Sequence, residues 1–435
     1  MRSEALGPLA VLVAAFALAA GGCGEQQRPF RIGVVVDCMG IARSLEIAEL
    51  SGAQMPLIER GGRPHGARMR NGLAQTDVAG RRVELVRGCT EAFEFSTLTR
   101  ELRRLTEVEH VDAVVAAGTG PDELVMRDVA RGHPHVLFVP VVHGPREVTL
   151  RETSPNVLRF AADYGQGVAG LATYAYLRLG WRRAAVVLGN WDAGWLSRDA
   201  FVAEFCALGG TVTDQVAVDS FDPAGRDVRR VPRGVDGTAV FAGQFFGPAG
   251  FIERLARRVG DPARKLIVGP GVVDEPSLLR ATGSAIDGVI GSSYVDPARM
   301  REHRRVHART FPGTSMTVAG NELVTGYRDA VEALLHGLEL AGGDTDRLPG
   351  ELAARRVELL DGSIRLNHDH QAVVTTFIVR IGGKAGGAAE PVLTPVDTVP
   401  GVDQSVGGLL SRTLEPSSRP AGCRRGARLP PWARR

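Results

Sequence analysis

The chain has 435 residues, of which 44% are hydrophobic and 23% charged. This composition is ordinary for a soluble globular protein, and the length allows two or three domains of roughly 150 residues. The formal net charge is +3, but residues 384–435 hold eight Lys or Arg against four Asp or Glu, so this tail alone carries +4. The remainder is near −1, and without a basic face on the folded part we expect no nucleic-acid partner.

The N-terminus has the pattern of an export signal. An apolar segment from Leu6 to Ala20 is followed by Gly21-Gly22-Cys23. A short apolar run that ends in small residues is typical of a signal peptide, because the peptidase needs small side chains beside the cut. The cysteine directly after them resembles a lipobox. We predict a lipoprotein signal peptide at 1–23, a lipid on Cys23, and an extracytoplasmic protein anchored to the bacterial membrane through that lipid. An uncleaved membrane anchor is the alternative, since the run is near the lower limit for spanning.

Strands and helices alternate along the rest of the chain. Residues 31–37 (RIGVVVD) form a continuous apolar run of the kind found in buried parallel strands. Further strands are predicted at 82–86, 111–117 and 136–142, with helices at 44–60, 96–109 and 122–131. After Pro155 the pattern restarts, with helices at 164–179, 197–208, 248–259, 276–282 and 318–341 and strands at 184–188, 211–218, 238–242, 265–268, 287–292 and 373–381. Two such α/β units predict two doubly wound, Rossmann-like lobes with a cleft between them. The tail at 383–435 is rich in Pro, Gly and Arg, and we expect it to be disordered.

Several short segments share their order and approximate spacing with one known family. They are SPNVLR at 154–159, LGWRRAAVV at 179–187, FVAEFCALGG at 201–210, IDGV at 286–289, GYRDA at 326–330 and GSIRL at 362–366. Together they resemble leucine/isoleucine/valine-type ABC transporter substrate-binding proteins, which have the periplasmic-binding-protein type I fold. The resemblance implies lobe 1 at 30–159 plus 296–360, lobe 2 at 160–295 plus 361–382, and a three-strand hinge. It also implies a protein that captures a small polar organic ligand, such as an amino acid or amide, and delivers it to ABC permease subunits. A lipoprotein that senses a ligand for a signalling partner, and a relative that has lost binding, are the alternatives.

Candidate ligand contacts lie on the loops after the strands, because ligands of open α/β sheets bind beyond the carboxyl ends of the strands. The candidates are Thr119, His143, Trp191, Asp192, Gln244, Phe245 and Asp274. Trp191 and Phe245 would supply an aromatic wall. The family resemblance implies that Thr119 could hold a ligand carboxylate and that Asp192, Asp274 or Glu275 could pair with an ammonium. Structural alternatives remain: Thr119 as a helix cap, His143 as a loop residue, and Asp274 as a charge at a helix N-terminus.

Motifs for catalysis are missing from the sequence, which contains no GxSxG, P-loop or GxGxxG. His368 and His370 stand on a predicted turn, and two ligands there are weak support for a metal site. We therefore predict a protein that is not an enzyme and has no cofactor or metal.

Two cysteines follow neighbouring predicted strands. Cys38 lies just past the first strand and Cys89 just past the second, and these strands are adjacent in a 2-1-3 sheet order. We predict a disulfide between them, with two free thiols as the alternative. Cys206 is expected to stay a buried thiol in a helix.

Overall fold

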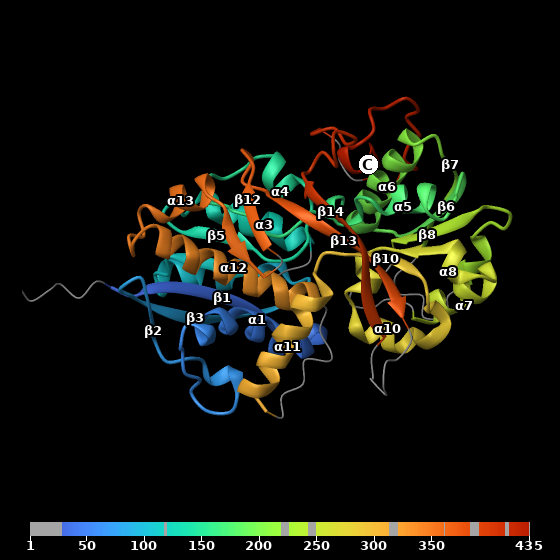
Figure 1. Cartoon of the computed structure of the whole chain (residues 1–435). Helices are drawn as coiled ribbons and strands as arrows, with labels where there is room; N and C mark the ends of the chain where they lie inside the picture. The colour runs from blue at the N-terminus through green and yellow to red at the C-terminus, as the bar shows by residue number, and fades with distance from the viewer. Residues whose placement is uncertain are drawn as a thin grey trace, which may run out of the picture.

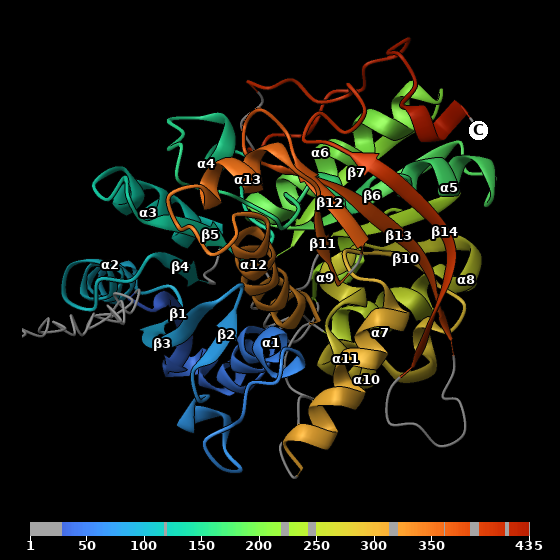
Figure 2. The same ribbon diagram turned by 60° about the vertical axis from the view of Figure 1, so that its left-hand side comes forward.

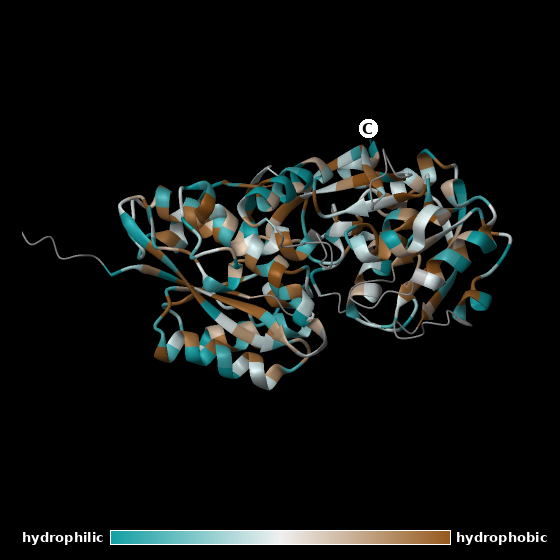
Figure 3. Ribbon diagram, turned by 90° about the horizontal axis from the view of Figure 1, so that it is seen from below, coloured by the Kyte–Doolittle hydropathy of each residue, from teal (hydrophilic) through white to brown (hydrophobic). Residues whose placement is uncertain are grey.

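The computed structural model describes residues 28–116, 120–218, 226–241, 249–312, 321–360, 362–382, 391–413 and 417–434. These residues form two α/β lobes that lie side by side (Figure 1). In Figure 3, hydrophobic residues follow the strands inside each lobe, while hydrophilic residues are frequent on the outer helices. The predicted fold class is confirmed.

Lobe 1 is built on a five-stranded sheet. Its strands are β1 (Phe30–Met39), β2 (Thr76–Val78), β3 (Arg81–Glu91), β4 (Ala113–Ala116) and β5 (Leu137–Pro140), in the spatial order β2-β3-β1-β4-β5. All pairs are parallel except β2 with β3. The helices of this lobe are α1 (Glu46–Glu59), α2 (Phe95–Arg103), α3 (Gly120–Arg131), α4 (Glu147–Leu150), α12 (Asn321–Leu340) and α13 (Leu348–Ala354).

Both faces of the first sheet are covered. Along β1, Val34 and Val36 belong to one apolar cluster together with side chains of α1 and α12. Val35 belongs to a second cluster with side chains of α2 and α3. Alternate side chains of a strand point to opposite faces, so a strand buried on both sides needs the unbroken apolar run found here.

A larger mixed sheet forms lobe 2 and extends across the hinge, where the strands at one of its ends pack against α12 and α13 of lobe 1. Its strands are β6 (Arg183–Gly189), β7 (Thr211–Val218), β8 (Gly237–Phe241), β9 (Leu266–Val268), β10 (Ile290–Ser293), β11 (Val357–Leu359), β12 (Gly362–Leu366), β13 (Ala372–Gly382) and β14 (Val392–Val402). The order is β11-β12-β13-β10-β9-β8-β6-β7, with β14 paired to β13. Strands β6 to β10 pair in parallel, and β13 is antiparallel to β10 and β14. The helices of this part of the chain are α5 (Leu171–Leu177), α6 (Asp192–Ala207), α7 (Ala249–Val259), α8 (Pro262–Lys265), α9 (Pro270–Val273) and α10 (Pro276–Thr282).

The chain passes between the lobes at three places. The first crossing runs through Arg159, whose backbone N–H donates to the carbonyl of His370 at 3.0 Å. The second leads from β10 through Tyr294 to α11 (Pro297–Thr310), and the third leads from β12 to β13. The first and third crossings are therefore hydrogen-bonded to each other. The residue bounds that the sequence suggests for each lobe stay a prediction.

The C-terminal tail differs from the expectation of disorder. Residues 392–402 form β14, which pairs antiparallel with β13 from Val374 to Gly382. The residues that follow fold over α5 and α6 (Figure 2). The expectation was wrong for the described part of the tail because the edge of β13 offers free backbone donors and acceptors to a Val- and Thr-containing segment. Residues 383–390 and 414–416 lie outside the described residues.

Two disulfides are present. Cys38 and Cys89 are joined with their Cα atoms 5.5 Å apart, the pair that the strand order predicts. Cys206 is joined to Cys423, also with a Cα separation of 5.5 Å. The prediction of a free thiol at Cys206 was therefore wrong, because it treated the tail that carries Cys423 as unable to dock.

Candidate functional site

The carboxyl ends of strands from both lobes meet at one junction. The first residue of α3 in lobe 1, Gly120, directly faces residues of lobe 2 and of the first crossing. A methyl group added to Gly120 would lie 2.8 Å from the Tyr164 hydroxyl and 2.9 Å from Asp192 Oδ2. A side chain at position 120 would therefore clash, and glycine lets the lobes approach this closely.

His143 reaches across the junction from the loop after β5. Its ring stacks on Tyr294 of the second crossing, with centroids 3.3 Å apart and an interplanar angle of 17°. Burial lowers the pKa of His143 to about 3, so the ring is neutral at physiological pH. Its Nδ1 lies 3.2 Å from the Ala162 carbonyl, and since a carbonyl only accepts, Nδ1 carries the proton. Nε2 is left as an acceptor, 3.9 Å from a carboxylate oxygen of Glu322.

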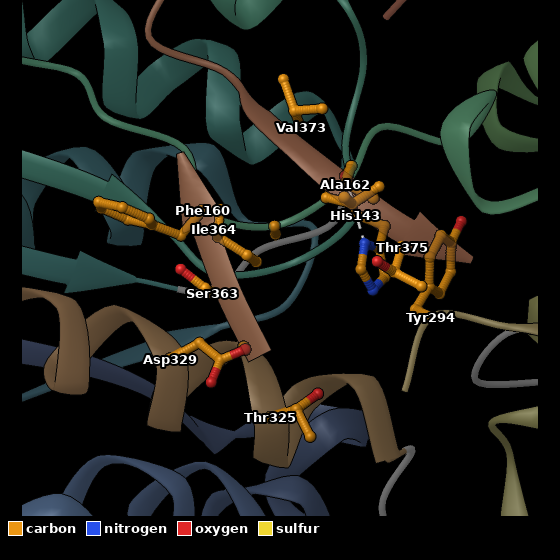
Figure 4. A pocket seen from close by; sticks show the side chains of 13 residues that line it. His143, Phe160, Ala162, Tyr294, Thr325, Asp329, Ser363, Ile364, Val373 and Thr375 are labelled. Carbon is orange, nitrogen blue, oxygen red and sulfur yellow. Dashed lines mark hydrogen bonds between the residues drawn. The ribbon is translucent and has the colours of Figure 1, made fainter. Parts of the chain in front are cut away.

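A cavity adjoins this stacked pair (Figure 4). It holds about 700 Å³ of empty space, counting the part that is open to solvent. Its walls combine apolar side chains such as Phe160 and Ile364 with the hydroxyls of Thr325, Ser363 and Thr375. These residues come from the first crossing, α12, β12 and β13, so the cavity changes shape if the lobes move. Because polar and apolar groups share this lining, the cavity is suited to a small organic molecule that has both.

Asp329 on α12 supplies the carboxylate of this cavity. One of its oxygens accepts the backbone N–H of Leu360 at 3.0 Å, which ties α12 to the turn before β12. Burial raises the pKa of Asp329 to about 7. The residue therefore has a structural hydrogen bond, and its burial favours the protonated form.

Trp191 and Asp192 lie at the start of α6, as the sequence predicts for a strand-end loop. The Trp191 ring meets Tyr164 edge-on, with centroids 6.0 Å apart and an angle of 65°. Asp192 Oδ1 accepts the N–H of Ala193 at 2.9 Å, and burial raises the pKa of Asp192 to about 6. Both residues stand where the lobes touch, and both remain candidate ligand contacts.

Asp274 is engaged in a different way. It is only 2% exposed, and its two oxygens accept from Ser293 Oγ at 2.5 Å and from the backbone N–H of Tyr294 at 2.9 Å. Burial raises its pKa to about 7. These bonds position the second crossing and therefore the ring of Tyr294. The cap of α10 is instead Glu275, whose side chain accepts from Ser277.

The remaining candidates, Thr119, Gln244, Phe245 and Cys23, lie outside the described residues. The sequence reasoning also missed Tyr164, Tyr294 and Asp329. Tyr164 and Tyr294 sit on the crossings rather than on strand-end loops, and an aromatic residue within a predicted crossing would have been the signal to follow.

The comparisons with known proteins identify the class. The family model described as periplasmic binding protein matches residues 29–388, so the chain belongs to the periplasmic binding protein family. No curated protein sequence matches the chain. Among solved structures, a substrate-binding protein of an ABC transporter from Sphaerobacter thermophilus shares 21% identity over 86% of this chain and 99% of its own, with a TM-score of 0.72.

Two other solved structures show the same fold. A solute-binding protein from R. palustris in complex with 4-hydroxybenzoate shares 17% identity over 88% of this chain and 100% of its own, with a TM-score of 0.70. A leucine binding protein from Thermotoga maritima shares 20% identity over 85% of this chain and 98% of its own, with a TM-score of 0.65.

The described ranges contain neither a membrane-spanning helix nor a metal-binding cluster. No helix there is long and apolar enough to cross a membrane. No group of three or more His, Cys, Asp or Glu side chains in the same ranges is arranged to hold a metal ion.

Proposed function

We propose that this chain is an extracytoplasmic solute-binding lipoprotein, which captures a small organic ligand between its lobes and delivers it to the permease of an ABC importer. The observation that carries the proposal is the junction itself. His143 of lobe 1 stacks on Tyr294 of the second crossing, beside a cavity whose walls come from lobe 1 and all three crossings. The walls of such a site come together when the lobes close and separate when they open. A protein of this fold would bind and release its ligand in this way.

The residues at the junction between the lobes, together with the hydroxyls of the adjoining cavity, support an organic ligand with both an apolar body and polar groups. Aromatic rings of Tyr164, Trp191 and Tyr294 stand near the contact between the lobes, together with the Asp192 carboxylate and several hydroxyls. Similar solved proteins carry hydroxybenzoates or are named for leucine, so amino acids, amides and aromatic acids are the ligands to test.

A thermal-shift screen tests the proposal. The protein from residue 24 onward, without the lipid anchor, is heated with single amino acids, amides, polyamines and aromatic acids. A ligand at 100 times its Kd stabilises the folded protein by about 2.7 kcal/mol, which gives a clear rise in Tm. A chain that shows no shift with any of these classes and no binding by calorimetry would contradict the proposal.

The lipid anchor is a separate part of the proposal and rests on Cys23 after Ala20-Gly21-Gly22. Replacing the thiol removes the atom that would be lipidated. Cys23→Ala is therefore expected to release the protein from the membrane fraction or to block its maturation. Membrane partition and processing identical to those of the unmodified protein would contradict lipidation.

A further inference from the structure

The C-terminal extension, residues 403–413 and 417–434, lies where the two lobes meet and beyond the family match, which ends at residue 388. Figures 1 and 2 both show these residues folded over α6, close to α4. We propose that this extension is a clasp: it is fixed to lobe 2, grips lobe 1, and stabilises the arrangement in which the lobes touch. Because the proposal concerns lobe movement, it can be tested without a known ligand.

The fixed end of the clasp is bound to lobe 2. The disulfide from Cys423 to Cys206 attaches it covalently to α6. The backbone of Ala421 exchanges two hydrogen bonds with the side chain of Gln215 on β7, at 2.9 and 2.7 Å. The indole N–H of Trp432 donates to Glu204 on α6 at 3.2 Å. This end of the extension must therefore move with lobe 2.

The gripping part of the clasp contacts lobe 1. Arg146, in the loop between β5 and α4, donates from Nη1 to the carbonyl of Ser411 at 2.8 Å. Thr149 on α4 donates to Oε1 of Gln404 at 3.3 Å. Arg146 is 1% exposed and Thr149 2%, so the bond from Thr149 to Gln404 is shielded from water and the bond from Arg146 to Ser411 is shielded on its donor side. A bond to the fixed extension is therefore also a bond between the lobes.

The extension also forms hydrogen bonds with the segments that cross between the lobes. Arg412 donates to both carboxylate oxygens of Asp369, each at 2.6 Å, on the turn that precedes β13. Directly before the extension, Val402 of β14 accepts from Gln166, just after the first crossing, at 2.8 Å, and this bond remains in a chain that ends at Val402. The bidentate geometry fixes the orientation of the turn as well as its position.

Opening the lobes would separate α4 from α6. Since Cys423 stays on α6, the bonds from Arg146 to Ser411 and from Thr149 to Gln404 must stretch or break. Arg146 also forms a buried ion pair with Asp163, just after the first crossing, at 3.8 Å. The extension therefore makes contacts that exist only when the lobes are together, and such contacts shift the equilibrium toward that state.

The decisive experiment removes the clasp. A chain that ends at Val402 and carries Cys206→Ser, to avoid a free thiol, is compared with the full chain by small-angle X-ray scattering. The truncated chain is shorter, so an increase in the radius of gyration of a sample that is folded and monomeric indicates separated lobes. Hydrogen exchange is expected to rise in α4 and in residues 367–371.

Point variants keep the test decisive if the truncated chain does not fold. Arg412→Gln removes the bidentate contact at an exposed side chain. Arg425→Gln is its control, because that arginine donates to Thr211 of lobe 2, the lobe to which the extension is already fixed. Cys38→Ser with Cys89→Ser is the control for Cys206→Ser with Cys423→Ser, because it removes a disulfide that lies within lobe 1. Faster exchange in α4 is expected only for Arg412→Gln and for the loss of the Cys206–Cys423 bond.

Two results would overturn the clasp. One is a folded truncated chain with a radius of gyration no larger than that of the full chain and unchanged exchange in α4. The other is a rate of hydrogen exchange in α4 that is the same in the Arg412→Gln and Arg425→Gln variants. Once a ligand is identified, loss of the clasp is expected to weaken its binding by about tenfold, because a smaller fraction of the protein is then in the competent state. If the truncated chain opens but neither it nor the full chain binds any ligand, the clasp proposal still stands. Only the solute-binding proposal is then contradicted.

Discussion

Replacing Arg159 with Gln is expected to destabilise the hinge strongly. The side chain is 0% exposed and lies on the first crossing. It donates to Glu123 on α3 at 3.0 Å, to the Gln371 side chain at 2.5 Å and to the Pro145 carbonyl at 2.8 Å. One buried cation therefore joins lobe 1 to both the first and the third crossing.

The expected loss follows from the carboxylate left behind. Breaking a buried ion pair by removing one partner costs about 3–5 kcal/mol, because the remaining charge has no compensation. Burial already raises the pKa of Glu123 to about 7 against the lowering effect of Arg159. In Arg159→Gln this pKa rises further, so Glu123 takes up a proton at low pH and part of the loss is relieved. The destabilisation should therefore be larger at pH 8 than at pH 5.

Urea unfolding at both pH values measures the effect, together with Glu123→Gln and the double variant. At pH 8 we expect about 3–5 kcal/mol for Arg159→Gln and a coupling of more than about 1 kcal/mol between the two sites. Arg131→Gln is the control, since its ion pairs with Asp128 and Glu152 are exposed and worth about 0–1 kcal/mol. A loss below 1 kcal/mol that does not depend on pH, with additive single variants, would refute the reasoning.

Three further predictions follow from other contacts. Since the pKa of Asp274 is raised from 3.8 to about 7, the folded protein binds the extra proton between these values, and its stability falls as the pH rises through this window by at most about 4 kcal/mol. Asp274→Asn should flatten that fall in a series of Tm measurements, and an unchanged slope would contradict the assignment. Trp191→Ala should weaken the binding of the ligand found in the screen by about 1–3 kcal/mol, as measured by calorimetry. Unchanged binding would show that the pocket lies elsewhere. Cys38→Ser with Cys89→Ser opens a loop that spans 51 residues and should lower the free energy of unfolding by about 4 kcal/mol, and alkylation of both cysteines in the unreduced, unmodified protein would show that the bond does not form.

The alternation of strands and helices was predictable because each element depends on the pattern of apolar residues within its own segment. A strand such as β1 needs an unbroken apolar run to be buried on both faces, and RIGVVVD has one. The Cys38–Cys89 pair could be expected for a related reason, since sheet order alone brings the ends of β1 and β3 together. The positions of Trp191 and Asp192 at a strand end follow from the same local pattern.

The contacts between the lobes could not be predicted in this way. The stacking of His143 on Tyr294 joins residues about 150 positions apart, and no periodicity of the sequence records it. Nor does the sequence show that both oxygens of Asp274 are occupied by Ser293 and by the backbone of Tyr294. These bonds arise from the angle at which two finished lobes meet.

The tail shows most clearly which features follow from the sequence and which depend on the tertiary structure. By itself the sequence determined the family, the α/β lobes and a C-terminal composition rich in Pro, Gly and Arg, because these depend on local patterns and composition. Only the tertiary structure decided that Cys423 meets Cys206, 217 residues earlier, and that Ser411 accepts from the buried Arg146. A segment with little apolar area of its own is ordered here by surfaces that exist only after the lobes have folded: the free edge of β13, the side of α6 and the hinge.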